Sequence, residues 1–252
     1  MSRSLSSELL KLRTTKTFYA LVGSSLGLVL AIAIIAAATG DWHPGPDDNP
    51  PGIDLLSLAM IAQLFAIVLG ILAVTSEFRH GTITPSLLVV PDRTRLMSAK
   101  VIVHLVAGVV FGLLTVILVL LLSSLVFGLR DIDAGLTGSE VVKAGLGTTL
   151  TIALYAALGV GIGAVVRNQV GAIVGTLAWI FVVESLLTII PGFDDVIAKF
   201  GLGGVATGLS GIDQGSTSTP PLDQVPAGLM LLLYTAIFAI AGTVLLKRRD
   251  VS

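Results

Sequence analysis

The sequence predicts an all-α polytopic membrane protein with six transmembrane helices in a single transmembrane domain, residues 1–252, and three observations carry this prediction. Hydrophobic residues make up 54% of the chain and charged residues only 12%, whereas a soluble domain carries about 25% charged residues. Mean hydropathy is +0.97. Six apolar stretches are each long enough for a helix to cross the hydrocarbon core, which takes about 20 residues.

The predicted spans are residues 18–39, 55–75, 101–122, 145–166, 170–190 and 226–246. They are predicted as helices because a chain in lipid must satisfy its backbone polar groups internally, and the alternating pattern of a membrane barrel is absent. The first span ends at Ala36, Ala37 and Ala38, which resemble a signal-peptide cleavage site. Its apolar core is longer than the roughly 7–15 residues of a signal sequence, so we expect an uncleaved first helix.

Basic residues are concentrated on one side of the predicted membrane. Twelve of the 15 Lys and Arg residues precede the first span, follow the sixth, or lie between spans 2 and 3 or spans 4 and 5. The opposite loops hold only Arg130, Lys143 and Lys199, together with most of the acidic residues. Short basic loops stay in the cytoplasm. We therefore expect a multi-pass plasma-membrane protein with both termini cytoplasmic.

Residues 1–17 allow two interpretations. Leu5, Leu9 and Leu12 share one helical face, and Lys11 and its basic neighbours can reach lipid headgroups, which is typical of an amphipathic elbow helix on the inner leaflet. The same residues also fit a basic segment that only orients the first span.

The longest outer segment is residues 191–225. Apolar residues occur at helical spacing over residues 194–209, and Asp194 and Asp195 favour a helix start. We therefore predict one short outer helix before the sixth span. Residues 211–221, rich in Gly, Ser, Thr and Pro, predict a flexible link.

The most informative polar segment is the loop of residues 76–100. Gly81 predicts a kink after the second span, and Thr84 and Pro85 are typical of a helix start. The resulting short helix would end at Pro91, and Asp92 would cap the helix that leads into the third span. On physical grounds this helix is either a docking element for a partner or a basic loop anchored on anionic lipid.

Several kinds of chemistry are missing from the sequence. It has no cysteine, which excludes disulfides and thiolate metal sites. The phosphate-binding pattern Gly-x-x-x-x-Gly-Lys-Ser/Thr does not occur. The three histidines, His43, His80 and His104, fall at different depths, which argues against a shared metal site. We therefore expect no catalytic, cofactor or metal site on this chain, which would not be an enzyme.

Inside the predicted membrane, Glu184 is the one clear carboxylate. It lies either on a transport path or in a structural role near the outer interface, hydrogen-bonded to a neighbouring helix. Glycine pairs four residues apart can allow close helix packing; they are Gly23/Gly27, Gly108/Gly112, Gly159/Gly163 and Gly171/Gly175.

The polar loop resembles the cytoplasmic coupling loop of type-2 ABC exporter permeases. The residues that carry the resemblance are Glu77, Gly81, Thr82, Ile83, Leu87, Leu88, Pro91, Arg93, Leu96 and Lys100. The opening segment from Ser7 to Thr14, Arg167 at a tight turn, and the basic end at residues 247–251 are similar to the same family. The resemblance thus extends over the full length.

The resemblance implies a permease subunit whose ATPase is a separate cytoplasmic chain, present in two copies and binding ATP and Mg²⁺. It also implies a second permease subunit, identical or homologous. The residues expected to couple to the ATPase are Glu77, Arg79, Gly81, Thr84, Pro85, Leu87, Leu88, Pro91, Arg93 and Arg95. Two other functions remain open: a secondary transporter or channel without an ATPase, and a regulatory membrane module that transports nothing.

Overall fold

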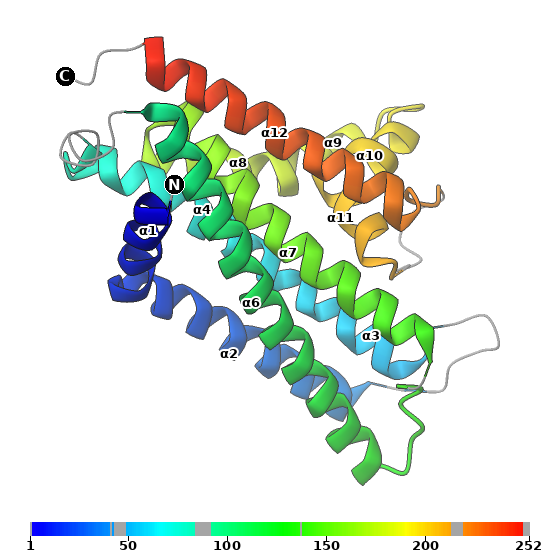
Figure 1. The fold of residues 1–252 in the computed structure, drawn as a ribbon. Coiled ribbons are helices and arrows are strands. Elements are labelled where there is room, and N and C mark those ends of the chain that lie inside the picture. Colours follow the sequence, from blue (N-terminus) through cyan, green and yellow to red (C-terminus); the bar gives the residue numbers. More distant parts are fainter. Residues whose placement is uncertain are drawn as a thin grey trace.

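The computed structural model describes residues 2–40, 42, 49–83, 92–136, 138–212 and 219–248. The described residues form helices, and no β-strand occurs among them. Six helical segments are long and apolar enough to cross a membrane, which confirms the all-α prediction and the position of every predicted span (Figure 1).

The chain begins with α1 (Ser2–Thr14) and α2 (Lys16–Thr39). It continues with the short helices α3 (Pro51–Ser57) and η1 (Leu58–Met60), which lead directly into α4 (Ile61–Arg79). The long helices α6 (Arg93–Leu129) and α7 (Ser139–Val166) follow. The fifth span consists of α8 (Gln169–Ala178), the π-helix η2 (Trp179–Val183) and α9 (Glu184–Leu187). The chain then forms α10 (Asp194–Phe200), α11 (Leu202–Ser210) and α12 (Gln224–Arg248).

Helix α7 lies at the centre of the bundle, where 83% of its membrane window is buried. It packs against α4, α6 and α12. A Cβ atom at Gly159 would lie 2.1 Å from the Ile67 carbonyl oxygen of α4, and one at Gly108 would lie 2.6 Å from the Ala153 Cα. Glycine therefore permits the close approach of α4 and α6 to α7.

The pairs Gly108/Gly112 and Gly159/Gly163 both pack against a neighbouring helix, as their spacing predicted. The other two pairs do not, because a Cβ at Gly23, Gly27 or Gly175 would meet no neighbouring atom within 4 Å, and one at Gly171 would meet only Asn168 of its own turn.

The described chain ends lie at one end of the bundle. Figure 1 shows α1, the end of α4, the start of α6 and the end of α12 gathered there, with α3 and α11 toward the opposite end. The two ends of the described chain, at the start of α1 and the end of α12, therefore lie on the same side of the helices.

The outer helical segment predicted over residues 194–209 is present, but it is divided into two helices. The structure has two helices, α10 and α11, separated at Gly201, whose ψ of 154° is extended rather than helical. The break is stabilised from outside, because the Glu184 carboxylate accepts hydrogen bonds from the backbone N–H groups of Leu202 and Gly203. Those groups have no partner within a helix that begins at Leu202. Residues 213–218 of the predicted link lie outside the described residues.

Candidate functional site

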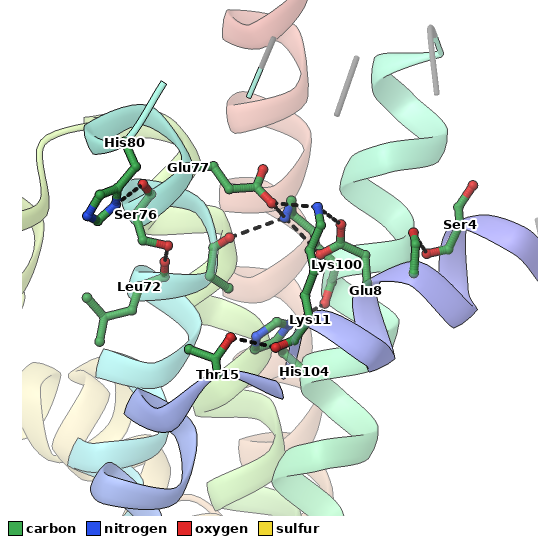
Figure 2. Close-up of polar contacts among 12 residues, drawn as sticks. Ser4, Glu8, Lys11, Thr15, Leu72, Ser76, Glu77, His80, Lys100 and His104 are labelled. Carbon is green, nitrogen blue, oxygen red and sulfur yellow. Dashed lines mark hydrogen bonds and ion pairs between the residues drawn. The ribbon is translucent and has the colours of Figure 1, made fainter. Parts of the chain in front are cut away.

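Four charged side chains from three helices meet inside the bundle, at the end where α1 lies (Figure 2). Lys100 Nζ of α6 lies 2.8 Å from Glu8 Oε2 of α1 and 2.7 Å from Glu77 Oε1 of α4. Lys11 Nζ of α1 contacts Glu8 Oε1 and Glu77 Oε1, both at 2.8 Å. We call Glu8, Lys11, Glu77 and Lys100 the charge cluster.

The charge cluster is neutral and largely buried. The Lys100 side chain is 1% exposed, Glu8 is 3% and Glu77 is 9%, whereas Lys11 is 44% exposed. Lys100 also donates a hydrogen bond to the Ala73 carbonyl oxygen at 3.2 Å. A buried pair is strongly destabilised when one partner is removed, because the remaining charge stays in a medium of low dielectric. The cluster therefore fixes α1 against α4 and α6.

The surroundings shift the pKa values of the two α1 groups. Burial opposes ionisation of Glu8, but the Lys100 ammonium and the hydrogen bonds from Lys100 and Lys11 outweigh it and hold the pKa of Glu8 below its ordinary value. Burial likewise disfavours the charged form of Lys11, and the hydrogen bonds to Glu77 and Glu8 outweigh this and raise the pKa of Lys11. Both groups are therefore charged at neutral pH.

Helix α1 presents a face of polar and apolar residues to the rest of the protein. Ser4, Glu8 and Leu12, spaced one turn apart, are buried, while Leu9 and Leu10 are exposed. Lys11, which we expected to reach lipid headgroups, instead binds the two carboxylates. Thr15, with an extended ψ of 117°, separates α1 from α2. The segment thus forms a separate helix before the first span, docked through its acid.

The end of α4 has a Schellman motif. Gly81 has a φ of +66°, the Thr82 N–H donates to the Glu77 carbonyl at 2.9 Å, and the Gly81 N–H donates to the Phe78 carbonyl at 3.3 Å. The kink predicted at Gly81 is confirmed. Arg79 points toward the start of α8, where its Nη1 donates to Gln169 Oε1 at 3.2 Å.

The start of α6 is capped as predicted. The Asp92 carboxylate accepts from the backbone N–H groups of Thr94 at 2.9 Å and Arg95 at 3.2 Å, and these bonds lower the pKa of Asp92. Arg93 donates to the carbonyl oxygens of Leu246 and Lys247 at the end of α12. Arg95 is exposed on the same turn of α6.

The structure distributes the residues predicted to couple to an ATPase among different environments. Glu77 is inside the charge cluster, Arg79 and Arg93 bind neighbouring helices, and Arg95 faces outward. Five of the predicted residues, Thr84, Pro85, Leu87, Leu88 and Pro91, lie outside the described residues. The loop is therefore described only at its two ends, residues 76–83 and 92–100.

Sequence reasoning missed Glu8 and Lys100 as functional candidates, and with them His104, whose Nδ1 lies 2.9 Å from the Lys100 carbonyl oxygen one turn below the cluster. The sequence did contain a signal for Glu8, because it is the only acidic residue among residues 1–17.

A cleft of about 590 Å³ adjoins the charge cluster, and its apolar walls include Leu12, Phe18, Leu69 and Leu72.

Glu184 lies at the opposite end of the bundle and is 5% exposed, and both of its carboxylate oxygens accept hydrogen bonds. Besides Leu202 and Gly203, it accepts a hydrogen bond from Trp179 Nε1 at 3.1 Å. Tyr155 and Tyr234 donate to the carbonyls of Leu202 and Phe200, both at 2.7 Å, and hold the same segment. These bonds fit the structural alternative for Glu184.

Six membrane-length helices, with the buried α7 at their centre, define a polytopic integral membrane protein. A family model described as ABC-2 family transporter protein matches residues 4–184, from α1 through the charge cluster to Glu184. The chain therefore belongs to the ABC-2 transporter family, as the resemblance of its loop indicated. No curated protein matches the chain.

Proposed function

We propose that this chain is the permease subunit of an ATP-driven exporter, coupled to a separate cytoplasmic ABC ATPase. Two permease chains, identical or homologous, would enclose the path, and two ATPase subunits would bind beneath them and supply ATP and Mg²⁺. The end of the bundle that carries α1 and the loop of residues 76–100 would then be cytoplasmic, in a plasma membrane. Family membership and the excess of basic residues at this end support the proposal.

The observation that carries the proposal is the position of the charge cluster at the base of the loop. Glu77 precedes the loop residues 84–91 and Lys100 follows them, and their side chains are 2.7 Å apart. A force on the loop would therefore reach α4 and α6 through a fixed junction. Arg93 extends this junction to the end of α12.

ATP drives such a change only if the ATPase pair binds one conformation of the permease more tightly than the other. In our proposal, closure of the ATPase pair around ATP pulls on the loop. The junction then transmits the displacement to the membrane helices, and access to the path alternates between the two sides. The outer helices α10 and α11 would cover the exit.

The proposal is tested by co-expressing the chain with the ABC ATPase of a neighbouring reading frame. We expect the two proteins to co-purify, and ATP-dependent transport in proteoliposomes to be blocked by vanadate. Arg95→Glu should weaken ATPase binding and leave the fold intact, because Arg95 is exposed on α6. Arg13→Glu is the matched control, an exposed charge of the same sign on α1.

Two results would contradict the proposal, and a third would contradict the role of Arg95. Transport that resists vanadate but stops with an uncoupler would indicate a secondary transporter. A co-purifying partner without any transport would indicate a regulatory module. Equal ATPase binding by the Arg95→Glu and Arg13→Glu variants would remove Arg95 from the docking surface.

A further inference from the structure

A cavity of about 460 Å³ lies toward the other end of the bundle, among α3, α4, η2, α10 and α11. Its volume is within the range of small-molecule sites, about 300–1,000 Å³. Ile180 and Phe181, both in the π-helix η2, form part of its wall. Single π-helical turns occur often at functional sites.

One polar side chain in this cavity is unpaired. Gln63, the third residue of α4, lines the cavity, and its Oε1 is buried without a hydrogen-bond partner among the described residues. An unpaired amide inside a membrane span is costly, and polar side chains there usually face a path or a partner. The packing of the described residues alone therefore gives no reason for an amide at this position.

The remaining polar groups on the cavity wall limit what could pair with Gln63. Ser57 donates its hydroxyl hydrogen to the Asp54 carbonyl at 2.6 Å, Thr188 to Ser185 at 2.8 Å and Thr207 to Gly203 at 3.1 Å. Their oxygens are left only as acceptors. The Gln63 amide therefore supplies the free side-chain donors, whereas its Oε1 is shielded from solvent in this conformation and would accept from a ligand only after the side chain rotates.

No ionisable side chain lines the cavity among the described residues. A charged ligand would lose its hydration there without gaining a counter-ion, which is unfavourable. A neutral ligand with an adjacent donor and acceptor would instead pair with both ends of the Gln63 side chain.

We propose that Gln63 is the recognition residue of a binding site for uncharged, mainly apolar molecules that carry an amide group. The ligand amide would accept from Gln63 Nε2 and, once the Gln63 side chain rotates to expose Oε1, donate to that oxygen, with its apolar part against Ile180, Phe181 and Leu64. If the chain is an exporter subunit, as proposed above, these molecules are a class of its transported substrates. The existence of the binding site itself does not depend on the exporter function.

The test uses two benzophenone photoprobes on the full chain in lipid nanodiscs. One is N-(4-benzoylphenyl)hexanamide, and the other is 4-heptylbenzophenone, in which two methylenes replace the amide. We expect the amide probe to label residues 57–64 or 180–207 of the wild type about five- to tenfold more than the hydrocarbon probe, the ratio expected for a neutral hydrogen-bonded pair. Gln63→Met, close in shape and without the amide, should make the two probes equal.

Thermal melting of the same variants supplies a second measurement. Gln63→Met should melt at the wild-type temperature or above, because it removes an unpaired amide and keeps the packing volume. Equal labelling of the wild type by both probes would overturn the proposal. A lower melting temperature or loss of a permease dimer in Gln63→Met would also overturn it, since Gln63 would then be structural.

Labelling without an ATPase keeps the two hypotheses separate. If the amide probe labels the site but ATP never changes the labelling of the assembled complex, the binding site stands and the exporter function fails. If the complex transports but the probes label the wild type equally, the function stands and this site fails.

Discussion

Replacing Lys100 by Met tests how much the charge cluster contributes to stability. The substitution keeps the length of the side chain and removes one charge that is 1% exposed, bonded to Glu8, Glu77 and the Ala73 carbonyl. The two carboxylates then remain buried with only Lys11 to balance them. Breaking a buried pair in this way costs about 3–5 kcal/mol.

Lys11→Met is the matched control, because Lys11 contacts the same two carboxylates but is 44% exposed. Its removal leaves both acids paired with Lys100, and water screens what remains. The expected loss is about 1 kcal/mol or less. The free energy of unfolding of both variants would be measured in mixed micelles by titration with a denaturing detergent, with hydrogen exchange of α1 as a local probe.

We expect Lys100→Met to lose at least about 2 kcal/mol more than Lys11→Met, and α1 to exchange faster. The double variant Glu8→Gln/Lys100→Met should lose less than the sum of the single losses, because the two groups interact directly. Equal losses for the two lysine variants, or strict additivity with Glu8→Gln, would refute the view that buried charge fixes α1 to the bundle.

The remaining predictions concern pH and packing. The pKa of Glu8 is lowered from 4.5, so its stabilisation should be complete above about pH 4.5 and be lost as the pH falls through the folded-state pKa. The hydrogen-exchange protection factors of α1, which correct for the pH dependence of intrinsic amide exchange, should fall between about pH 7 and about pH 3.5, and unchanged protection factors would contradict this. The pKa of Lys11 is raised from 10.5, so its contribution should be lost only as the pH rises beyond that value. Gly159→Ala should lower stability by about 1–3 kcal/mol in thermal melting, because the new methyl would meet a carbonyl oxygen at 2.1 Å. Gly175→Ala, with open space around it, should be neutral or slightly stabilising, and equal effects at the two sites would contradict the packing argument.

The sequence was sufficient to predict features that depend on nearby residues. The six spans follow from apolar length, the kink from Gly81, and the start of α6 from Asp92, because each depends on residues within a turn or a span. The break between α10 and α11 was not predicted, because the Glu184 carboxylate that caps α11 lies 18 residues before Leu202 in the chain. Apolar spacing alone could not show it.

The charge cluster could not be predicted from local patterns either. Glu8 and Lys100 are 92 residues apart, and Lys11 and Glu77 are 66 apart. Periodicity assigned Lys11 to lipid headgroups because the leucines of α1 suggested an amphipathic helix lying on the inner leaflet. In the structure a buried acid occupies that face, and the packing of three helices decides the partners of each charge.

The glycine contacts around α7 have a mechanical consequence. Backbone carbonyls of α4 and Cα atoms of α7 lie where side chains would otherwise act as spacers, so α4, α6 and α7 have little room to slide past one another. Only 22% of the membrane window of α2 and 17% of that of the fifth span are buried. The membrane window of α12 is also only 22% buried. Tilting and sliding should therefore be concentrated in these three peripheral helices, while the central three move as a rigid unit.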